Sequence, residues 1–193
     1  MSLFLKTFRP IRDKFLADFW NNKWSETTVI YRARPGWDAP INDILNLDTG
    51  FEEAEMLEYV YDMDWDKIDD PDEKVKAILE WVHNNITYRG DFVTRKMAEY
   101  WQKAYETFKT REGDCEDGAI LIYKLARLAG MPTFRLKICA GDVANPKDID
   151  KVVGHAYIIY LSEKVNFWNT VDWCYYFNQS LMSFNFIPHG EQK

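Results

Sequence analysis

A cysteine at the predicted start of a helix is the residue in this sequence best suited to covalent chemistry. Cys115 lies in the stretch "REGDCEDGAIL", residues 111–121, and apolar residues then recur at helical spacing as far as Gly130 and Pro132, which end the helix. Asp114 is a suitable N-cap for it. Because the N–H groups and the dipole of a helix start favour a thiolate, Cys115 is a candidate nucleophile.

The acidic residues around this cysteine oppose its activation. Asp114, Glu116 and Asp117 are its nearest acidic neighbours in the chain, and a carboxylate beside a thiol raises the thiol pKa. We expect these three side chains to point away from the sulfur, as helix caps or ion-pair partners. The helix start and a nearby imidazolium would then stabilise the thiolate.

A histidine and an aspartate further along the chain are positioned by the pattern of two strands. Residues 155–162, "HAYIIYLS", and 165–173, "VNFWNTVDW", have strand composition and are separated by Glu163–Lys164. A two-residue turn there places His155 directly opposite Asp172 on one face, with Cβ atoms about 5 Å apart. The carboxylate could then hold one ring nitrogen, and a slip of one residue would separate the pair.

These three residues together would support nucleophilic acyl transfer. The Cys115 sulfur would attack a carbonyl, and His155 would act first as base and then as acid toward the leaving amine. Asp172 would hold the histidine tautomer. The backbone N–H of Cys115 is the first expected oxyanion donor. The candidates for a second donor are Trp101, Gln102 and Tyr88.

Composition sets limits on the function. The net charge of −7 argues against general nucleic-acid binding, which needs a basic surface. The sequence has no run of 18 apolar residues, so we expect no membrane span. The first residues do not resemble a signal peptide, and three cysteines favour reduced thiols, so we expect a cytoplasmic protein. No residue spacing suggests a zinc site or a phosphate loop, and we expect no cofactor.

The order of the predicted elements indicates an α+β fold. The expected helices cover residues 51–65, 69–88, 94–108 and 115–130, and the expected strands cover 133–140, 155–162 and 165–173, with a polar loop at 141–154. Helices therefore come first and an antiparallel sheet last. We expect one compact domain, with residues 1–71 as an N-terminal extension on a core of residues 72–193.

Several motifs together resemble the transglutaminase-like cysteine enzyme superfamily. They are "ILEWVHNNITYRGD", "GDCEDGAIL", "LARLAGMP", "GHAYIIYL" and "WNTVDW", which span roughly residues 72–175. The resemblance implies a papain-like core, with the nucleophile at a helix start packed on an antiparallel sheet, and thioester chemistry. By position it assigns nucleophile, base and orienting acid to Cys115, His155 and Asp172. This chain has "HAY" where the family usually has His-Ala-Trp, and the histidine is intact.

Within that superfamily the motifs look most like bacterial and bacteriophage members of the cysteine proteinase type. One branch binds calcium through acidic residues that flank the cysteine, which would be Asp114 and Glu116 here. Our interpretation of these two acids is instead helix capping and solvated charge. We therefore expect no metal.

The function that we expect is hydrolysis of an amide or peptide bond in a protein or peptide substrate, with water as the acceptor. A protein-crosslinking transglutaminase is one alternative. Another is a bacteriophage assembly protein, virion-associated, that uses the fold as a binding scaffold. Its docking surfaces for phage or host proteins would be the basic, aromatic helix in the first twenty residues and the aromatic tail 174–188.

Overall fold

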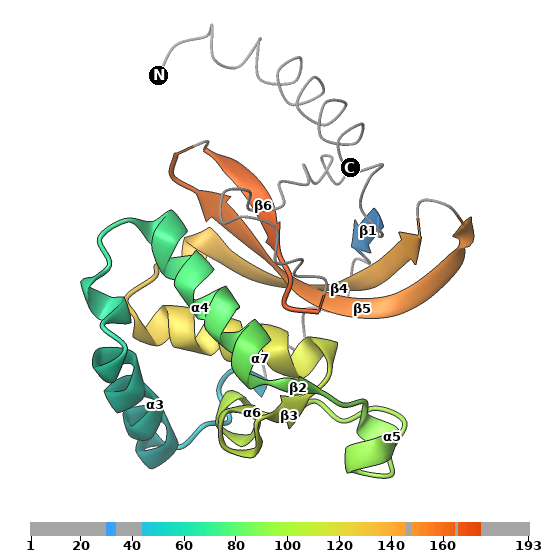
Figure 1. Ribbon diagram of the computed structural model, residues 1–193, viewed down its shortest axis with the longest axis horizontal. Coiled ribbons are helices and arrows are strands. Elements are labelled where there is room, and N and C mark those ends of the chain that lie inside the picture. The colour runs from blue at the N-terminus through green and yellow to red at the C-terminus, as the bar shows by residue number, and fades with distance from the viewer. Residues whose placement is uncertain (1–29, 34–43, 146–147, 165, 175–193) are drawn as a thin grey trace, which may run out of the picture.

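The fold has two layers, a group of helices and a four-stranded antiparallel sheet. The computed structural model describes residues 30–33, 44–145, 148–164 and 166–174. Figure 1 shows the helices gathered on one side of the sheet. The α+β class predicted from the sequence is confirmed.

The helical layer is built from five α-helices within the described residues. They are α3 (Gly50–Asp62), α4 (Pro71–Asn85), α5 (Asp91–Thr94), α6 (Ala104–Thr110) and α7 (Cys115–Leu128). Short 3-10 helices follow α3 and α7, at η1 (Trp65–Lys67) and η2 (Thr133–Arg135). The side chain of Asp70 caps α4 by accepting from the backbone N–H groups of Asp72 and Glu73. Pro71 occupies the first turn of that helix, where its missing N–H costs nothing.

The sheet has the strand order β1-β4-β5-β6, with every neighbouring pair antiparallel. Its strands are β1 (Ile30–Ala33), β4 (Leu136–Asn145), β5 (Asp148–Ser162) and β6 (Phe167–Val171). A separate parallel pair joins β2 (Thr87–Tyr88) to β3 (Glu112–Gly113), just before α7. This pair ties the end of α4 to the segment that carries Cys115.

Three expectations about the elements are wrong. The region 94–108 is helical only at Thr94, the end of α5, and from Ala104, in α6, which extends to Thr110. The expected polar loop 141–154 is mostly strand, because β4 and β5 pair along a long hairpin as far as Asn145 and Asp148. The turn between β5 and β6 has four residues, 163–166, since Ser162 pairs with Phe167. In the last two cases, the hydrogen bonds between strands set how long each strand is and which residues pair. The amino-acid composition of these segments did not indicate either feature.

Helix α7 lies at the centre of the molecule. It packs against β4 and β5 on one side and against α3, α4 and α6 on the other. Its apolar residues Ile120, Leu121, Ile122 and Leu125 are fully buried, which explains why this helix is apolar on most of its faces. The hydrophobic core continues from Ile44 to Trp173 as one cluster. The boundary expected after residue 71 stays a prediction.

A buried carboxylate joins the helical layer to the β5–β6 hairpin. Asp72, in the first turn of α4, accepts hydrogen bonds from the Tyr160 hydroxyl at 2.6 Å and the Ser162 hydroxyl at 2.8 Å. The backbone N–H groups of Glu163 and Lys164, in the turn, also donate to it. The hairpin that carries His155 and the end of β6 is thereby anchored to α4.

The expected N-terminal helix and the aromatic tail 174–188 lie outside the described residues, apart from Cys174 at the start of the tail. Among the helices that the structure does describe, none has the length and apolar character needed to cross a membrane.

Candidate active site

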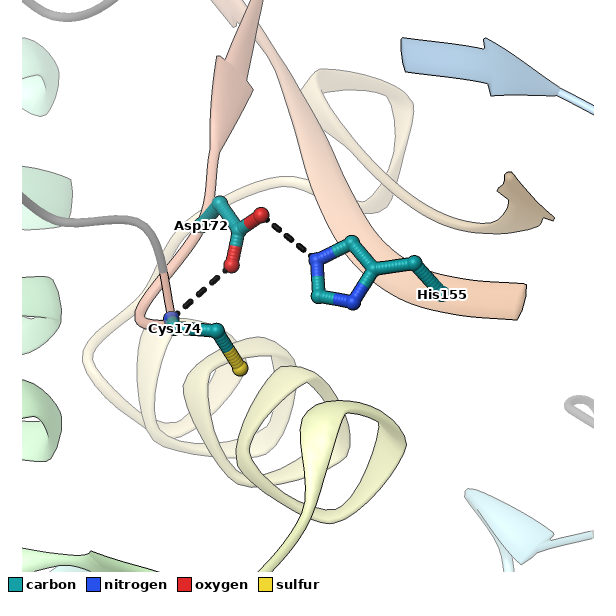
Figure 2. A group of neighbouring side chains, drawn as sticks. All are labelled: His155, Asp172 and Cys174. Atoms are coloured by element: carbon teal, nitrogen blue, oxygen red, sulfur yellow. Dashed lines mark hydrogen bonds and ion pairs between the residues drawn. The ribbon is translucent and has the colours of Figure 1, made fainter. Parts of the chain in front are cut away.

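The imidazole of His155 and the carboxylate of Asp172 form a short, buried hydrogen bond. Nε2 of His155, on β5, lies 2.6 Å from Oδ2 of Asp172, which follows β6 (Figure 2). Their exposed fractions are 8% and 7%. The backbone N–H of Cys174 donates to Oδ1 of Asp172 at 2.9 Å and holds the carboxylate from the other side.

The strand register that creates this pair differs from the one that we expected. Because the turn has four residues, the observed pairing continues from Ser162–Phe167 to Ile158–Val171. His155 and Asp172 therefore do not lie directly opposite one another. The register is displaced by two residues, an even number, so both side chains stay on the same face and meet along the diagonal.

Cys115 begins α7 and lies beside the same strand. The backbone amide of Ala156, the residue after His155, lowers the pKa of the Cys115 thiol. Asp114 is the N-cap of the helix, and its backbone N–H donates to the Asp117 carboxylate. The packing of α7 on β5 thus brings the candidate nucleophile to the part of β5 that carries the histidine.

Of the three acidic neighbours, Asp117 acts in the helix cap as expected, but Asp114 and Glu116 stay close to the sulfur. The thiol donates to Oε2 of Glu116 at 3.0 Å. Burial, and next to it the Glu116 carboxylate, raise the pKa of the Cys115 thiol, whereas the Ala156 amide lowers it. The interpretation of Asp114 and Glu116 as solvated charges is wrong, because they are only 8% and 4% exposed.

These acids belong to a larger cluster of carboxylates beside the nucleophile. Oxygen atoms of Asp91, Asp114 and Asp117 lie within 4.8 Å of one another, and so do those of Asp91, Glu99 and Glu116. Burial raises the pKa of Asp114 and of Asp91, and it raises the pKa of Asp117 to about 7. Asp91 was not singled out from the sequence, because it comes from a separate segment and only folding brings it to the helix start.

The carboxylate cluster fits a hard divalent cation. Oδ1 of Asp91 and Oδ1 of Asp114 are buried and have no hydrogen-bond partner among the described residues. Buried carboxylates gathered at this spacing are costly unless a positive charge offsets them. Oxygen ligands of this kind suit Ca²⁺ or Mg²⁺. Asp91, Glu99, Asp114 and Glu116 are the residues that would hold such an ion.

The three candidates for a second oxyanion donor have different surroundings. Gln102 is buried, and its side-chain amide donates to Asp117 Oδ2 at 2.6 Å and to the Glu112 carbonyl at 3.2 Å. Its two amide protons are therefore already used, one on Asp117 and one on the Glu112 carbonyl. The Trp101 indole donates to Glu99 at 2.8 Å.

Tyr88 is the candidate whose hydroxyl has no such competing partner described. Its ring packs against Trp173, with centroids 5.8 Å apart. The residue is 58% exposed. Its partial burial, and next to it the charge of Cys115, raise the pKa of its phenol, so the hydroxyl keeps its proton. A protonated phenol near the sulfur can donate to a developing oxyanion.

Trp173 connects the aspartate to the start of α7, a role that we did not expect from the sequence. Its indole N–H donates to the Cys115 carbonyl at 3.3 Å, and its own carbonyl lies 2.9 Å from Nδ1 of His83. A Cβ atom at Gly118 would lie 2.1 Å from the indole nitrogen. Glycine at this position therefore permits Trp173 to lie directly on the first turn of α7.

Comparison with known proteins identifies a family match. The Transglutaminase-like superfamily model matches residues 63–173, which is more than half of the chain. No curated protein matches the chain in sequence.

Among solved structures, a candidate cysteine protease from Cytophaga hutchinsonii is 23% identical, with a TM-score of 0.48. The match covers 75% of this chain but only 48% of that one, so the chain spans about half its length. LapG from Legionella pneumophila is 17% identical over 69% of this chain and 72% of its own, with a TM-score of 0.46. A calcium-bound LapG is 16% identical over 69% and 71%, with a TM-score of 0.41.

Proposed function

Because this chain belongs to the transglutaminase-like superfamily, we propose that it is an enzyme that hydrolyses an amide or peptide bond through a thioester on Cys115. One observation carries the proposal. The imidazole of His155 is held by Asp172 at 2.6 Å, and α7, which begins at Cys115, packs on the strand that carries this histidine. A nucleophile and an oriented base are what acyl transfer through a cysteine requires.

The hydrogen bond to Asp172 decides which ring nitrogen does the chemistry. The Asp172 carboxylate accepts the Nε2 proton, so Nδ1 is the ring nitrogen whose lone pair can accept a proton. In the proposed first step, Nδ1 takes the thiol proton of Cys115 and the sulfur attacks the carbonyl carbon. The oxyanion that forms accepts from the backbone N–H of Cys115, which is free of intrahelical bonds in the first turn, and from the Tyr88 hydroxyl.

Collapse of this intermediate completes the acylation. The carbon–nitrogen bond breaks, and the leaving amine takes the proton from Nδ1 of His155. Water then enters, gives a proton to the same nitrogen and attacks the thioester carbonyl. The sulfur leaves, regains its proton from His155, and the acid product departs. Water is the default acceptor, and an amine at the same place would give a crosslink instead.

The carboxylate cluster bears on the charge of the nucleophile. A divalent cation held by Asp91, Glu99, Asp114 and Glu116 would offset the negative potential that raises the Cys115 pKa. In the absence of such an ion, Asp114 and Glu116 disfavour the thiolate. His155 then has to accept the thiol proton even though the neighbouring carboxylates favour the protonated sulfur.

Alkylation with iodoacetamide tests the proposal without knowledge of the substrate. The rate at each of the three cysteines is measured over a pH series by mass spectrometry, with Cys139 as the internal reference because burial raises its pKa to about 11. Although the resting thiol is neutral, His155 can accept its proton as the sulfur reacts, so we expect faster labelling of Cys115 than of Cys139 near neutral pH. We also expect a decrease of at least tenfold in His155→Ala. Equal rates at both cysteines, unaffected by His155→Ala, would contradict the proposed function.

A further inference from the structure

A third side chain capable of binding a metal ion lies beside His155 and Asp172. The Cys174 sulfur, an imidazole nitrogen and a carboxylate oxygen lie within 4.8 Å of one another. Figure 2 shows the His155 and Asp172 side chains pointing toward one another, with Cys174 next to them. The proposed reaction uses the histidine and the aspartate but leaves the Cys174 thiol without a role.

The three ligand types are those that zinc takes in proteins. Zinc binds thiolate at about 2.3 Å and imidazole or carboxylate at about 2.0–2.2 Å in tetrahedral sites. Ligand atoms around one zinc ion are therefore about 3.3–3.8 Å apart. The spacing here needs only small side-chain shifts to reach that geometry. The Nε2–Oδ2 separation of 2.6 Å would lengthen as the ion replaces the shared proton.

The backbone restricts how these groups can move relative to one another. Cys174 and Asp172 are two residues apart, and the Cys174 amide donates to the Asp172 carboxylate. The residue between them, Trp173, is only 3% exposed and is fixed on α7 by its indole hydrogen bond. His155 is 8% exposed on the adjoining strand. The ligands are therefore held together before an ion arrives, which lowers the cost of ordering them on binding.

The composition of this group distinguishes it from the carboxylate cluster. Sulfur and nitrogen ligands favour zinc and similar transition metals, whereas calcium and magnesium prefer oxygen alone. Asp91, Glu99, Asp114 and Glu116 offer oxygen alone. The two groups should therefore take different metals.

We propose that His155, Asp172 and Cys174 form a binding site for Zn²⁺ and that zinc bound there inhibits the enzyme reversibly. The ion binds Nε2 of His155, whose proton moves to Nδ1, and it replaces the thiol proton of Cys174, which passes to solvent; no redox step is involved. Because Nδ1 then carries a proton, His155 no longer accepts the proton of Cys115. The inhibitory effect rests on the proposed hydrolase function, whereas the binding itself does not.

Cobalt provides a direct test of the binding site, since a thiolate bound to Co²⁺ gives a charge-transfer absorption in the near ultraviolet. The full chain is titrated with Co²⁺, and then with Zn²⁺ as competitor, for the wild type and for three single variants. These are Cys174→Ser, Cys115→Ser and Cys139→Ser, and Cys139 on β4 is the matched control. Circular dichroism and thermal unfolding check that each variant is folded.

We expect the cobalt band at one ion per chain in the wild type, in Cys115→Ser and in Cys139→Ser, but not in Cys174→Ser. Zinc should abolish the band, and excess Ca²⁺ should leave it unchanged. A band that persists in Cys174→Ser, or no band in the wild type, would overturn the proposal. His155→Ala, as a second variant, should weaken cobalt binding at least tenfold.

The inhibitory effect is measured separately. Zinc should slow alkylation of Cys115 at least tenfold in the wild type, a chelator should restore the rate, and Cys174→Ser should require at least tenfold more zinc. An unchanged rate with zinc bound would refute inhibition. A Cys115 without enhanced reactivity, together with a normal cobalt band, would contradict the hydrolase function and leave the metal site standing.

Discussion

At the scale of single residues, the reactivity of Cys115 depends on opposing electrostatic influences. The helix start and the Ala156 amide favour the thiolate, and burial and Glu116 disfavour it. The balance in the metal-free protein is toward the neutral thiol. Asp172 affects the sulfur indirectly, because its hydrogen bond to His155 selects the tautomer of the imidazole.

The change Glu116→Gln tests this account of the thiol. It removes the charge nearest to the sulfur but keeps a similar shape, so we expect a lower Cys115 pKa and faster alkylation at a given pH. Since one pKa unit is a factor of ten in thiolate population, an increase of about three- to tenfold is a reasonable expectation. The measurement is the pH profile of Cys115 alkylation in EDTA.

Glu112→Gln is the matched control, because that side chain lies in the same motif but pairs with Arg89 at 3.0 Å. It should leave the profile unchanged. A Glu116→Gln profile that coincides with the wild type would show that this carboxylate does not set the thiol pKa.

At the scale of elements, the site depends on how α7 is placed against the β5–β6 hairpin. Trp173 lies between them, with its indole on the first turn of α7 and its backbone beside Asp172. Asp72 holds the other end of the same hairpin. Both contacts are made by residues outside the proposed triad.

The change Gly118→Ala should displace Trp173. The added methyl group would lie 2.1 Å from the indole nitrogen, and overpacking of this kind costs about 1–3 kcal/mol. We expect that loss in the free energy of unfolding measured in urea, together with slower alkylation of Cys115. Gly50→Ala is the control, since nothing lies within 4 Å of its added Cβ, and it should not destabilise the protein.

The change Asp72→Ala should loosen the hairpin. It leaves two hydroxyl groups and two turn amides without their acceptor, which we expect to cost about 3 kcal/mol in unfolding free energy. Glu73→Ala, at the exposed neighbouring position, should cost less than about 1 kcal/mol. Equal effects of the two changes in urea unfolding would refute the anchoring role of Asp72.

At the scale of the whole molecule, the buried carboxylates make stability depend on pH. Asp117 has a pKa of about 7 when folded and about 3.9 when unfolded. The folded state therefore binds more protons than the unfolded state between these values. By linkage, the contribution of this group to stability is highest below pH 4 and falls as the pH rises toward 7.

We therefore expect the unfolding free energy in EDTA to contain a component that decreases between pH 5 and 7. Its slope is at most about 1.4 kcal/mol per pH unit for each such carboxylate. The raised pKa of Asp114 acts in the same direction, so Asp114→Asn should reduce the slope. Saturating Ca²⁺ should reduce it as well, because bound cations favour the ionised carboxylates. An Asp114→Asn protein with the wild-type slope would contradict this prediction.

The sequence by itself determined the local structure and the identity of the candidate residues. The helix start at Cys115, the cap at Asp114 and the strand character around His155 follow from short-range rules of spacing, capping and turn chemistry. Family motifs then supported the pairing of Cys115 with His155 and Asp172. The α+β order of the elements followed from the same periodicities.

Tertiary structure decided the features that depend on contacts between distant segments. The four-residue turn, the long β4–β5 hairpin and the burial of Asp114 and Glu116 follow from packing that no local pattern contains. The arrival of Asp91 at the carboxylate cluster and the place of Trp173 on Gly118 have the same origin. The segments that fold over an acidic residue decide whether it is solvated or buried beside a thiol. Here the burial of these acids reversed the expected shift of the Cys115 pKa.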